Sequence, residues 1–174
     1  AATDLSSIGN ATTGAVTVSN AVKITGTQSQ LTAALVTEGS KVGAASALVT
    51  VSDAAFANTN STIAATDLSS IGNATTGAVT VTNAIKITGS QSEVTAALVT
   101  EGSKVGASSA AVTISDATYD ATNRNVTMNA SDLKSIGNAT TGTVTLTNLQ
   151  RISGTQADVT AALVTEASKV VAGA

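Results

Sequence analysis

The chain of 174 residues contains no cysteine, histidine, proline or tryptophan, and it has one phenylalanine, one tyrosine and one methionine. Without cysteine and histidine, it lacks the commonest protein ligands of zinc, iron and copper. It also lacks thiol nucleophiles and the base of a histidine-dependent triad. We therefore expect no enzymatic activity and no resident cofactor. Because no disulfide is possible, the fold must be stabilised by packing.

Charge is scarce as well. Charged residues make up 11% of the chain, against roughly 25% in ordinary domains. The net charge is −3 and the basic residues are spread thinly, which argues against a nucleic-acid partner. No apolar run reaches the roughly 18 residues of a membrane span. Small side chains dominate, so the core must bring neighbouring backbones close together.

The chain contains five copies of a pattern typical of a strand, in which branched apolar residues alternate with small hydroxyl residues. The copies begin at Val16, Val49, Val79, Val112 and Val144, and are 33, 30, 33 and 32 residues apart. A longer period lies above this one, because the motif Thr3–Asn10 returns at 66–73 and 131–138. We therefore predict one repeat array of three units, 1–63, 64–128 and a partial 129–174. Since the chain begins and ends within the pattern, we expect a mature product or an excerpt of a longer chain.

Two kinds of connector separate the strand signals. The longer one begins after a glycine with a capping-box pattern, in which a hydroxyl and a later acid or amide satisfy the first helical turn. The pairs are Thr27 with Gln30, Ser90 with Glu93, and Thr155 with Asp158. Apolar residues then recur at helical spacing, and they are Leu31, Ala34, Leu35, Val42; Val94, Ala97, Leu98, Val105; and Val159, Ala162, Leu163, Val170.

From this spacing we predict helices of three to four turns. Opposite charges three residues apart are expected on their outer side, and these pairs are Glu38–Lys41, Glu101–Lys104 and Glu166–Lys169. Gly39 and Gly102 are candidates to end the helix early, whereas Ala167 allows it to run on in the third unit. The shorter connector, with Leu5, Ile8 and then Gly9 in its first copy, predicts one or two helical turns with a glycine C-cap.

Alternating strands and helices joined by tight turns predict a parallel sheet. Because the strands alternate rather than being apolar throughout, the helices should cover one face only. We therefore predict an α/β fold, a one-sided solenoid of strand–helix repeats whose five strand segments form a single sheet. The alternative is a parallel β-helix with extended connectors.

The most specific surface feature is a double file of hydroxyl residues on the exposed face of this sheet. Its members are Thr17, Thr50, Thr80, Thr113 and Thr145 in one file, and Ser19, Ser52, Thr82, Ser115 and Thr147 in the other. A regular threonine array resembles the surfaces of ice-binding solenoids, and glycans are a second possible ligand. Threonine is also simply a good residue for an exposed strand.

Each strand signal ends in an asparagine or aspartate: Asn20, Asp53, Asn83, Asp116 and Asn148. Asp53 and Asp116 are weak candidates for calcium, a hard ion that needs several oxygen ligands. The simpler interpretation is local capping of turns as Asx turns. Gly14, Gly77 and Gly142 precede strands and are expected to form turns.

Stretches such as 48–55 and 11–18 resemble the Ala/Thr/Val-rich repeats of giant secreted or cell-surface proteins of marine cyanobacteria and of virion proteins of their phages. The resemblance implies an extracellular, filamentous, structural role, at the cell surface or on a virion. We expect a stiff spacer or adhesive segment of a filament, surface layer, appendage or phage projection. Its partners should be further repeats or copies of itself, head to tail or lateral. The alternative is a binding module that uses the Thr/Ser face.

Overall fold

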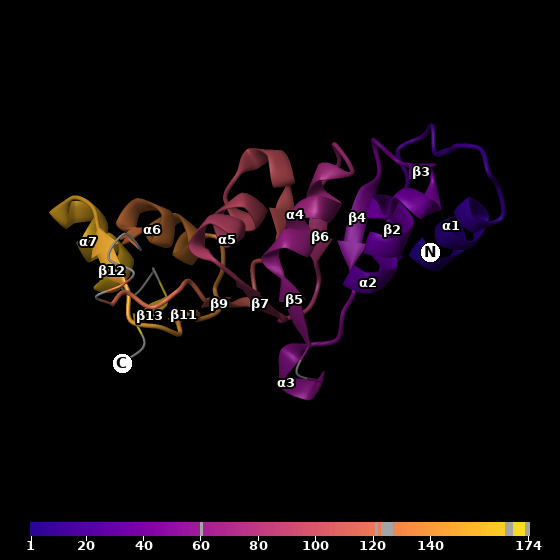
Figure 1. Cartoon of the computed structure of the whole chain (residues 1–174). Coiled ribbons are helices and arrows are strands. Elements are labelled where there is room, and N and C mark those ends of the chain that lie inside the picture. Colours follow the sequence, from indigo (N-terminus) through magenta and orange to yellow (C-terminus); the bar gives the residue numbers. More distant parts are fainter. Residues whose placement is uncertain (60, 121, 123–126, 166–168, 173–174) are drawn as a thin grey trace.

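The structure is a computed structural model, which describes all residues except 60, 121, 123–126, 166–168 and 173–174 (Figure 1). Its α-helices are α1 (Ala2–Asn10), α2 (Gln28–Leu31), α3 (Phe56–Thr59), α4 (Ala65–Asn73), α5 (Gln91–Leu98), α6 (Ala130–Asn138) and α7 (Gln156–Leu163). Helix α2 continues as the π-helical turn η1 (Thr32–Val36), and two 3-10 turns are η2 (Glu38–Ser40) and η3 (Glu101–Ser103).

The strands are short and all their pairings are parallel, which confirms the parallel sheet arrangement. They are β1 (Val16–Thr17), β2 (Lys23–Gly26), β3 (Val42–Gly43), β4 (Leu48–Val51), β5 (Thr62–Ala64), β6 (Val79–Val81), β7 (Lys86–Gly89), β8 (Val105–Gly106), β9 (Ala111–Ile114), β10 (Thr127–Asn129), β11 (Val144–Leu146), β12 (Arg151–Ser153) and β13 (Val170–Ala172).

The described strands form four sheets, with the orders β1-β3, β2-β4-β6-β8, β5-β7-β9-β11-β13 and β10-β12. The single five-membered sheet expected from the sequence is therefore wrong. Of the five strand signals, β1 lies in one sheet, β4 and β6 in a second, and β9 and β11 in a third. The reason is that strands on both sides of the B helices also enter the sheets. The signals β1 and β6 pair with the strands that follow α2 and α5, β3 and β8, and the signals β4 and β9 pair with the strands that precede these helices, β2 and β7.

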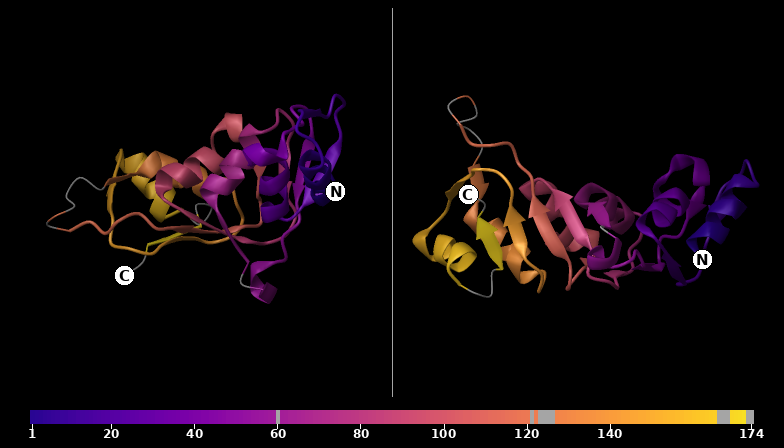
Figure 2. Two further views of the ribbon diagram at one scale, coloured as in Figure 1. Left: turned by 45° about the vertical axis from the view of Figure 1, so that its right-hand side comes forward. Right: turned by 90° about the horizontal axis from the view of Figure 1, so that it is seen from below.

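Six helices follow one another in a row, in the order α1, α2 with η1, α4, α5, α6 and α7. We call α1, α4 and α6 the A helices, and α2, α5 and α7 the B helices; the two kinds alternate. Figures 1 and 2 show α5, α6 and α7 on one side of strands β7, β9 and β11, with the two chain ends at opposite ends of the molecule. The fold is thus a mixed α/β arrangement with several parallel sheets.

The core is built from Ala, Val, Ile and Leu side chains that point between the sheets and the helix row. Val49 and Val51 on β4, and Val112 and Ile114 on β9, are at most 1% exposed. The alternation that identified the strands therefore correctly identified their buried side. Removing such aliphatic side chains from water stabilises the fold by roughly 1.5–3 kcal/mol for each side chain.

The capping boxes form as expected at the first two B helices. The Thr27 hydroxyl accepts from the Gln30 amide, and the Thr27 amide donates to Gln30 Oε1. Ser90 and Glu93 repeat both bonds. In the third copy the Thr155 hydroxyl accepts from the Asp158 amide and donates to Asp158 Oδ2. This is a weaker variant, because the Asp158 carboxylate bonds to the Thr155 hydroxyl and not to the Thr155 backbone amide.

The B helices end earlier than predicted. Helix α5 stops at Leu98, and Val42, Val105 and Val170 lie on strands rather than on helices. The chain turns because Lys41 and Lys104 are left-handed, both with a φ of 53°. This turn also separates the expected charge pairs: Lys104 Nζ donates to the Gly102 carbonyl, and Lys41 Nζ to Gly39. Glu166 and Ala167 lie outside the described residues.

The A helices are longer than expected, and their glycine is not a C-cap. Gly9 and Gly72 lie within α1 and α4, one residue before the helix ends. A Cβ at Gly72 would stand 2.0 Å from the Ser103 carbonyl oxygen, and one at Gly9 would stand 1.8 Å from that of Ser40. Glycine is present because the helix backbone touches the turn that follows the next B helix.

The polar tract 56–62 contains the short helix α3, where Lys86 Nζ lies 5.4 Å from the centre of the Phe56 ring. Its counterpart in the second unit falls largely outside the described residues. Among the described helices, none is long and apolar enough to cross a membrane.

Candidate functional surfaces

The hydroxyl files lie on the solvent side of the strands, as predicted. Their members are exposed or half-buried: Thr17, Ser19, Ser52, Thr80, Thr82, Ser115 and Thr147 are exposed, and Thr50, Thr113 and Thr145 are half-buried. Two hydroxyls of the second file are engaged, since Thr82 Oγ1 donates to the Val51 carbonyl and Thr147 Oγ1 to that of Ile114, both at 3.1 Å. These two are therefore only partly available to a ligand.

The first file is not continuous. Thr50 lies beside Thr80, and Thr113 lies beside Thr145. However, Thr17 pairs with Gly43, and the other neighbour of Thr80 is Gly106. The division of the strands among three sheets therefore leaves two pairs of the expected five threonines. Thr25 beside Thr50 and Thr88 beside Thr113, which the sequence analysis did not include, extend each pair to a row of three. This arrangement is less suited to a flat ice plane than the sequence suggested.

One surface hollow of about 320 Å³ lies on this face. It is lined by Lys23, Leu48, Val49, Thr50, Ala78, Thr80 and Thr82. A cation, several hydroxyls and the half-exposed Leu48 side chain give this hollow both polar and apolar character.

The strand-end acids Asp53 and Asp116 accept hydrogen bonds from helix amides. Asp53 Oδ2 accepts from the backbone amide of Gln28, and Asp116 Oδ2 accepts from that of Gln91, each at 2.6 Å. Each carboxylate therefore caps the first turn of a B helix 25 residues earlier in the chain. A negative charge at this position also interacts favourably with the helix dipole.

The strand-end asparagines link neighbouring repeats. Asn83 Nδ2 donates to the Asp53 carbonyl at 2.6 Å, and Asn148 Nδ2 donates to that of Asp116 at 2.7 Å. The expectation of local Asx turns was therefore wrong, because these side chains bond across the stack; Asn20 is exposed. Within the described ranges no group of three or more acidic, histidine or cysteine side chains is placed to hold a metal ion.

Sequence reasoning missed the most regular contact in the molecule. Thr75 Oγ1 donates to the Ala47 carbonyl and Thr76 Oγ1 to the Ala45 carbonyl, at 2.6 and 2.8 Å. In the next unit Thr140 donates in the same way to Ala110, and Thr141 to Ser108. The signal was available, because Ala-Thr-Thr-Gly occurs at 11–14, 74–77 and 139–142. We call this motif the threonine clamp; it holds the turn before β4 or β9.

The first copy of the threonine clamp, at 11–14, contacts no neighbouring turn in the described part of the chain. Thr12 and Thr13 are exposed, whereas Thr75 and Thr140 are 4% and 5% exposed. A Cβ at Gly77 would stand 2.2 Å from the Ala47 carbonyl oxygen, but one at Gly14 would meet only Thr12 Oγ1, at 3.7 Å. Residues that are internal contacts in the second and third units therefore form a surface in the first.

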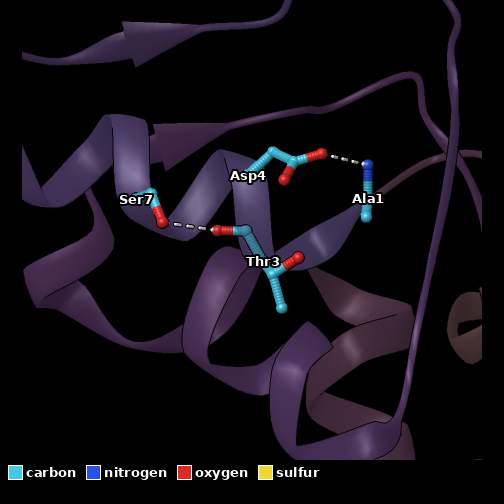
Figure 3. A network of polar contacts seen from close by, with 4 residues as sticks. All are labelled: Ala1, Thr3, Asp4 and Ser7. Carbon is cyan, nitrogen blue, oxygen red and sulfur yellow. Dashed lines mark hydrogen bonds and ion pairs between the residues drawn. The ribbon is translucent and has the colours of Figure 1, made fainter.

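Helix α1 shows the same difference. Ile8 is 53% exposed, while the equivalent Ile71 and Ile136 are fully buried. Close by, the Ala1 ammonium lies 2.9 Å from Asp4 Oδ2, and Ser7 Oγ donates to the Thr3 carbonyl (Figure 3). We call the surface formed by Ile8 and residues 11–14 the N-terminal face.

Searches of protein-family models, of curated proteins and of solved structures found no match to this chain.

Proposed function

We propose that this protein is a structural or adhesive repeat segment of an extracellular filament, surface layer, appendage or phage projection, in which it acts as a stiff spacer. The proposal includes the solenoid arrangement and a location at the cell surface or on a virion. It excludes a catalytic role, and it rests on stacking of each module against its neighbours.

The observation that carries this proposal is the contrast between equivalent residues at the end and in the middle of the stack. Ile8 on the N-terminal face is 53% exposed, whereas its equivalents Ile71 and Ile136 are fully buried. They lie on α4 and α6, each of which contacts the B helix that precedes it. The alternation of A and B helices leaves α1 at one end and α7 at the other. A further repeat, or a second copy placed head to tail, would therefore set a B helix against α1, as α2 is set against α4.

The experiment is sedimentation velocity over a range of protein concentrations, with two substitutions compared. We expect the chain to associate, Ile8→Lys to abolish association, and Leu48→Lys to leave it unchanged. Leu48 is a matched control because it is 51% exposed but lies on the hydroxyl side of the sheet. A chain that stays monomeric at every concentration, or one in which only Leu48→Lys prevents association, contradicts head-to-tail stacking.

A second candidate function is favoured by the hollow beside Lys23, Thr50 and Thr80, whose hydroxyl lining suits a glycan. A glycan array tests it directly, and a Thr80→Lys variant should lose any signal because the longer side chain fills the hollow. Measurement of thermal hysteresis tests the ice-binding alternative. Absence of both activities leaves the structural role.

A further inference from the structure

The outward faces of the two large sheets carry rows of threonines whose hydroxyls are unused. In the sheet β2-β4-β6-β8, Thr25, Thr50 and Thr80 lie side by side on adjacent strands. Neighbouring strands are about 4.8 Å apart, so this row extends over about 10 Å. Thr25 and Thr80 are exposed and Thr50 is half-buried, and none of the three hydroxyls has a hydrogen-bond partner among the residues that the structure describes. The row therefore offers its hydroxyls to a ligand.

A free cation lies beside this row. Lys23 begins β2, and it is on the same face as Thr25 because side chains alternate along a strand. It is exposed, and within the described part of the chain it forms no ion pair and no hydrogen bond. Among the described residues that line the hollow on this face, Lys23 is the one charged residue. An anionic group in the hollow would therefore meet a cation and no carboxylate.

The hollow is apolar on the side of Leu48. This side chain is 51% exposed, lies beside Lys23 on the neighbouring strand, and lines the hollow together with Ala78. The volume of about 320 Å³ is at the lower end of the range for small-ligand sites. A sugar residue matches these features, since its ring carbons form an apolar face and its hydroxyls can bond to the threonine row. The lysine adds a preference for a sugar that carries a carboxylate.

The sheet β5-β7-β9-β11-β13 repeats the arrangement. Its row consists of Thr88, Thr113 and Thr145, whose hydroxyls are likewise unpartnered within the described ranges. Lys86 begins β7 as Lys23 begins β2, and its ammonium lies 5.4 Å from the centre of the Phe56 ring. Two such sites on one chain suit a polymer better than a single sugar, because a polymer that reaches both binds more tightly than either site alone.

We propose that these two rows bind a linear acidic polysaccharide, a chain of uronic acid residues. In each site a sugar carboxylate pairs with the lysine and sugar hydroxyls bond to the threonines; in the first site a ring face covers Leu48. The net charge of −3 does not prevent this, because charges farther away than about 8 Å are screened at physiological ionic strength. The inference rests on the glycan-binding candidate function given above and names its ligand class.

The test measures binding of short fluorescent oligomers of galacturonate and of mannuronate to the whole chain by anisotropy. The methyl ester of each oligomer is the matched neutral ligand, because it keeps the sugar and the linkage and removes the charge. We expect the acids to bind about two- to fivefold more tightly than the esters, the range of an exposed ion pair. Raising the ionic strength from about 0.05 M to about 0.5 M should remove this difference, since it shortens the screening length.

The decisive variants remove the two lysines of the rows. Lys23→Gln combined with Lys86→Gln should bind acids and esters equally, whereas arginine at both positions should keep the preference for the acids. The control combines Lys41→Gln with Lys134→Gln, which removes two other exposed cations that do not line the hollow, and it should leave the preference unchanged. Circular dichroism of each variant checks that it is folded.

A second set of variants locates the ligand at the threonine rows. Thr80→Glu with Thr145→Glu is compared with Thr80→Gln and Thr145→Gln, because glutamate and glutamine have the same size and differ in charge. The glutamate pair should bind the acids about two- to fivefold more weakly than the glutamine pair, and the two should bind the esters equally.

Equal binding of acids and esters to the unmodified chain overturns the inference but leaves the glycan candidate, which the glycan array tests. A preference that the control variant lowers as much as the Lys23 and Lys86 variant also overturns it, because the attraction is then non-specific. Equal effects of glutamate and glutamine, or no binding of any oligomer, overturn it as well. None of these outcomes bears on stacking, which sedimentation velocity measures separately.

Discussion

The Thr75 hydroxyl donates to the Ala47 carbonyl at 2.6 Å, and this bond joins two modules that are 28 residues apart in the chain. The hydroxyl also accepts from the Gly77 amide. One buried side chain therefore bonds both within its own clamp and to the turn that precedes β4. The equivalent hydroxyl of the first unit, that of Thr12, bonds only to the Gly14 amide among the residues that the structure describes. A comparison of Thr75 with Thr12 therefore distinguishes what contacts between modules contribute to stability from what bonds within the local turn contribute.

Replacement of Thr75 by valine should lower the free energy of unfolding by about 1–3 kcal/mol, because the Ala47 carbonyl and the Gly77 amide lose a buried partner. Thr12→Val should change it by no more than about 0.5 kcal/mol, since Thr12 is exposed. Urea denaturation followed by circular dichroism measures both. Equal effects would mean that the hydroxyl acts within its own turn and not between modules.

Replacing the glycine of the threonine clamp by alanine should destabilise the fold in the second unit and stabilise it in the first. Gly77→Ala places a Cβ 2.2 Å from the Ala47 carbonyl oxygen, and we expect a loss of about 1–3 kcal/mol as the modules separate. Gly14→Ala meets no close backbone atom and should stabilise by about 0.4–1 kcal/mol by restricting the unfolded chain. Thermal unfolding of the two variants under identical conditions gives the comparison. Destabilisation by both would contradict an open N-terminal face.

Truncation of the A-helix isoleucine should strongly lower the free energy of unfolding only where this side chain is buried between modules. Ile71→Ala leaves a cavity at a fully buried position and should cost about 2–5 kcal/mol. Ile8→Ala, at a position 53% exposed, should cost less than about 1 kcal/mol. The comparison should be made by chemical denaturation at low protein concentration, so that association does not contribute. A similar loss in both would indicate that Ile8 is covered in solution.

Replacing a lysine that has a left-handed backbone conformation by glycine should stabilise the fold. Lys104 has a φ of 53°, a conformation that costs an ordinary residue about 1–2 kcal/mol. Lys104→Gly relieves this strain, although it adds freedom to the unfolded chain, so we expect a net gain of up to about 1 kcal/mol. Lys134→Gly, at an exposed position inside α6, should lose about 1 kcal/mol instead. A loss in the Lys104 variant would indicate that its bond to Gly102 matters more than backbone strain.

Local features of the fold were predictable because they depend on neighbours in sequence. The capping boxes at Thr27 and Ser90 need only residues three positions apart, and the alternation in Val49-Thr50-Val51 reports which side of a strand is buried. The end of the B helix was not predictable in this way. Val42 has suitable spacing for a helix, but Lys41 adopts a left-handed conformation that no sequence pattern required.

The candidate surfaces were predicted less well, because they depend on how modules pair. The hydroxyl residues were correctly placed on the solvent side. Their continuity was not, since Thr17 lies beside Gly43 and Thr80 beside Gly106 as well as Thr50. The capping bonds of Asp53 and Asp116 were not predicted, because the helix amide that each accepts is contributed by a distant segment; calcium binding by these acids stays a prediction.

The sequence by itself determined that the chain is a parallel α/β repeat with thin apolar side chains inside, because periodicity and composition act within a few residues of each position. Only the tertiary structure decided which strands are neighbours, and hence that the five strand signals belong to three sheets. Strand pairing is a competition among several segments of similar pattern, and its outcome depends on contacts 24 to 32 residues apart. The threonine clamps, the close glycine contacts and the aspartate caps are the contacts that settle it.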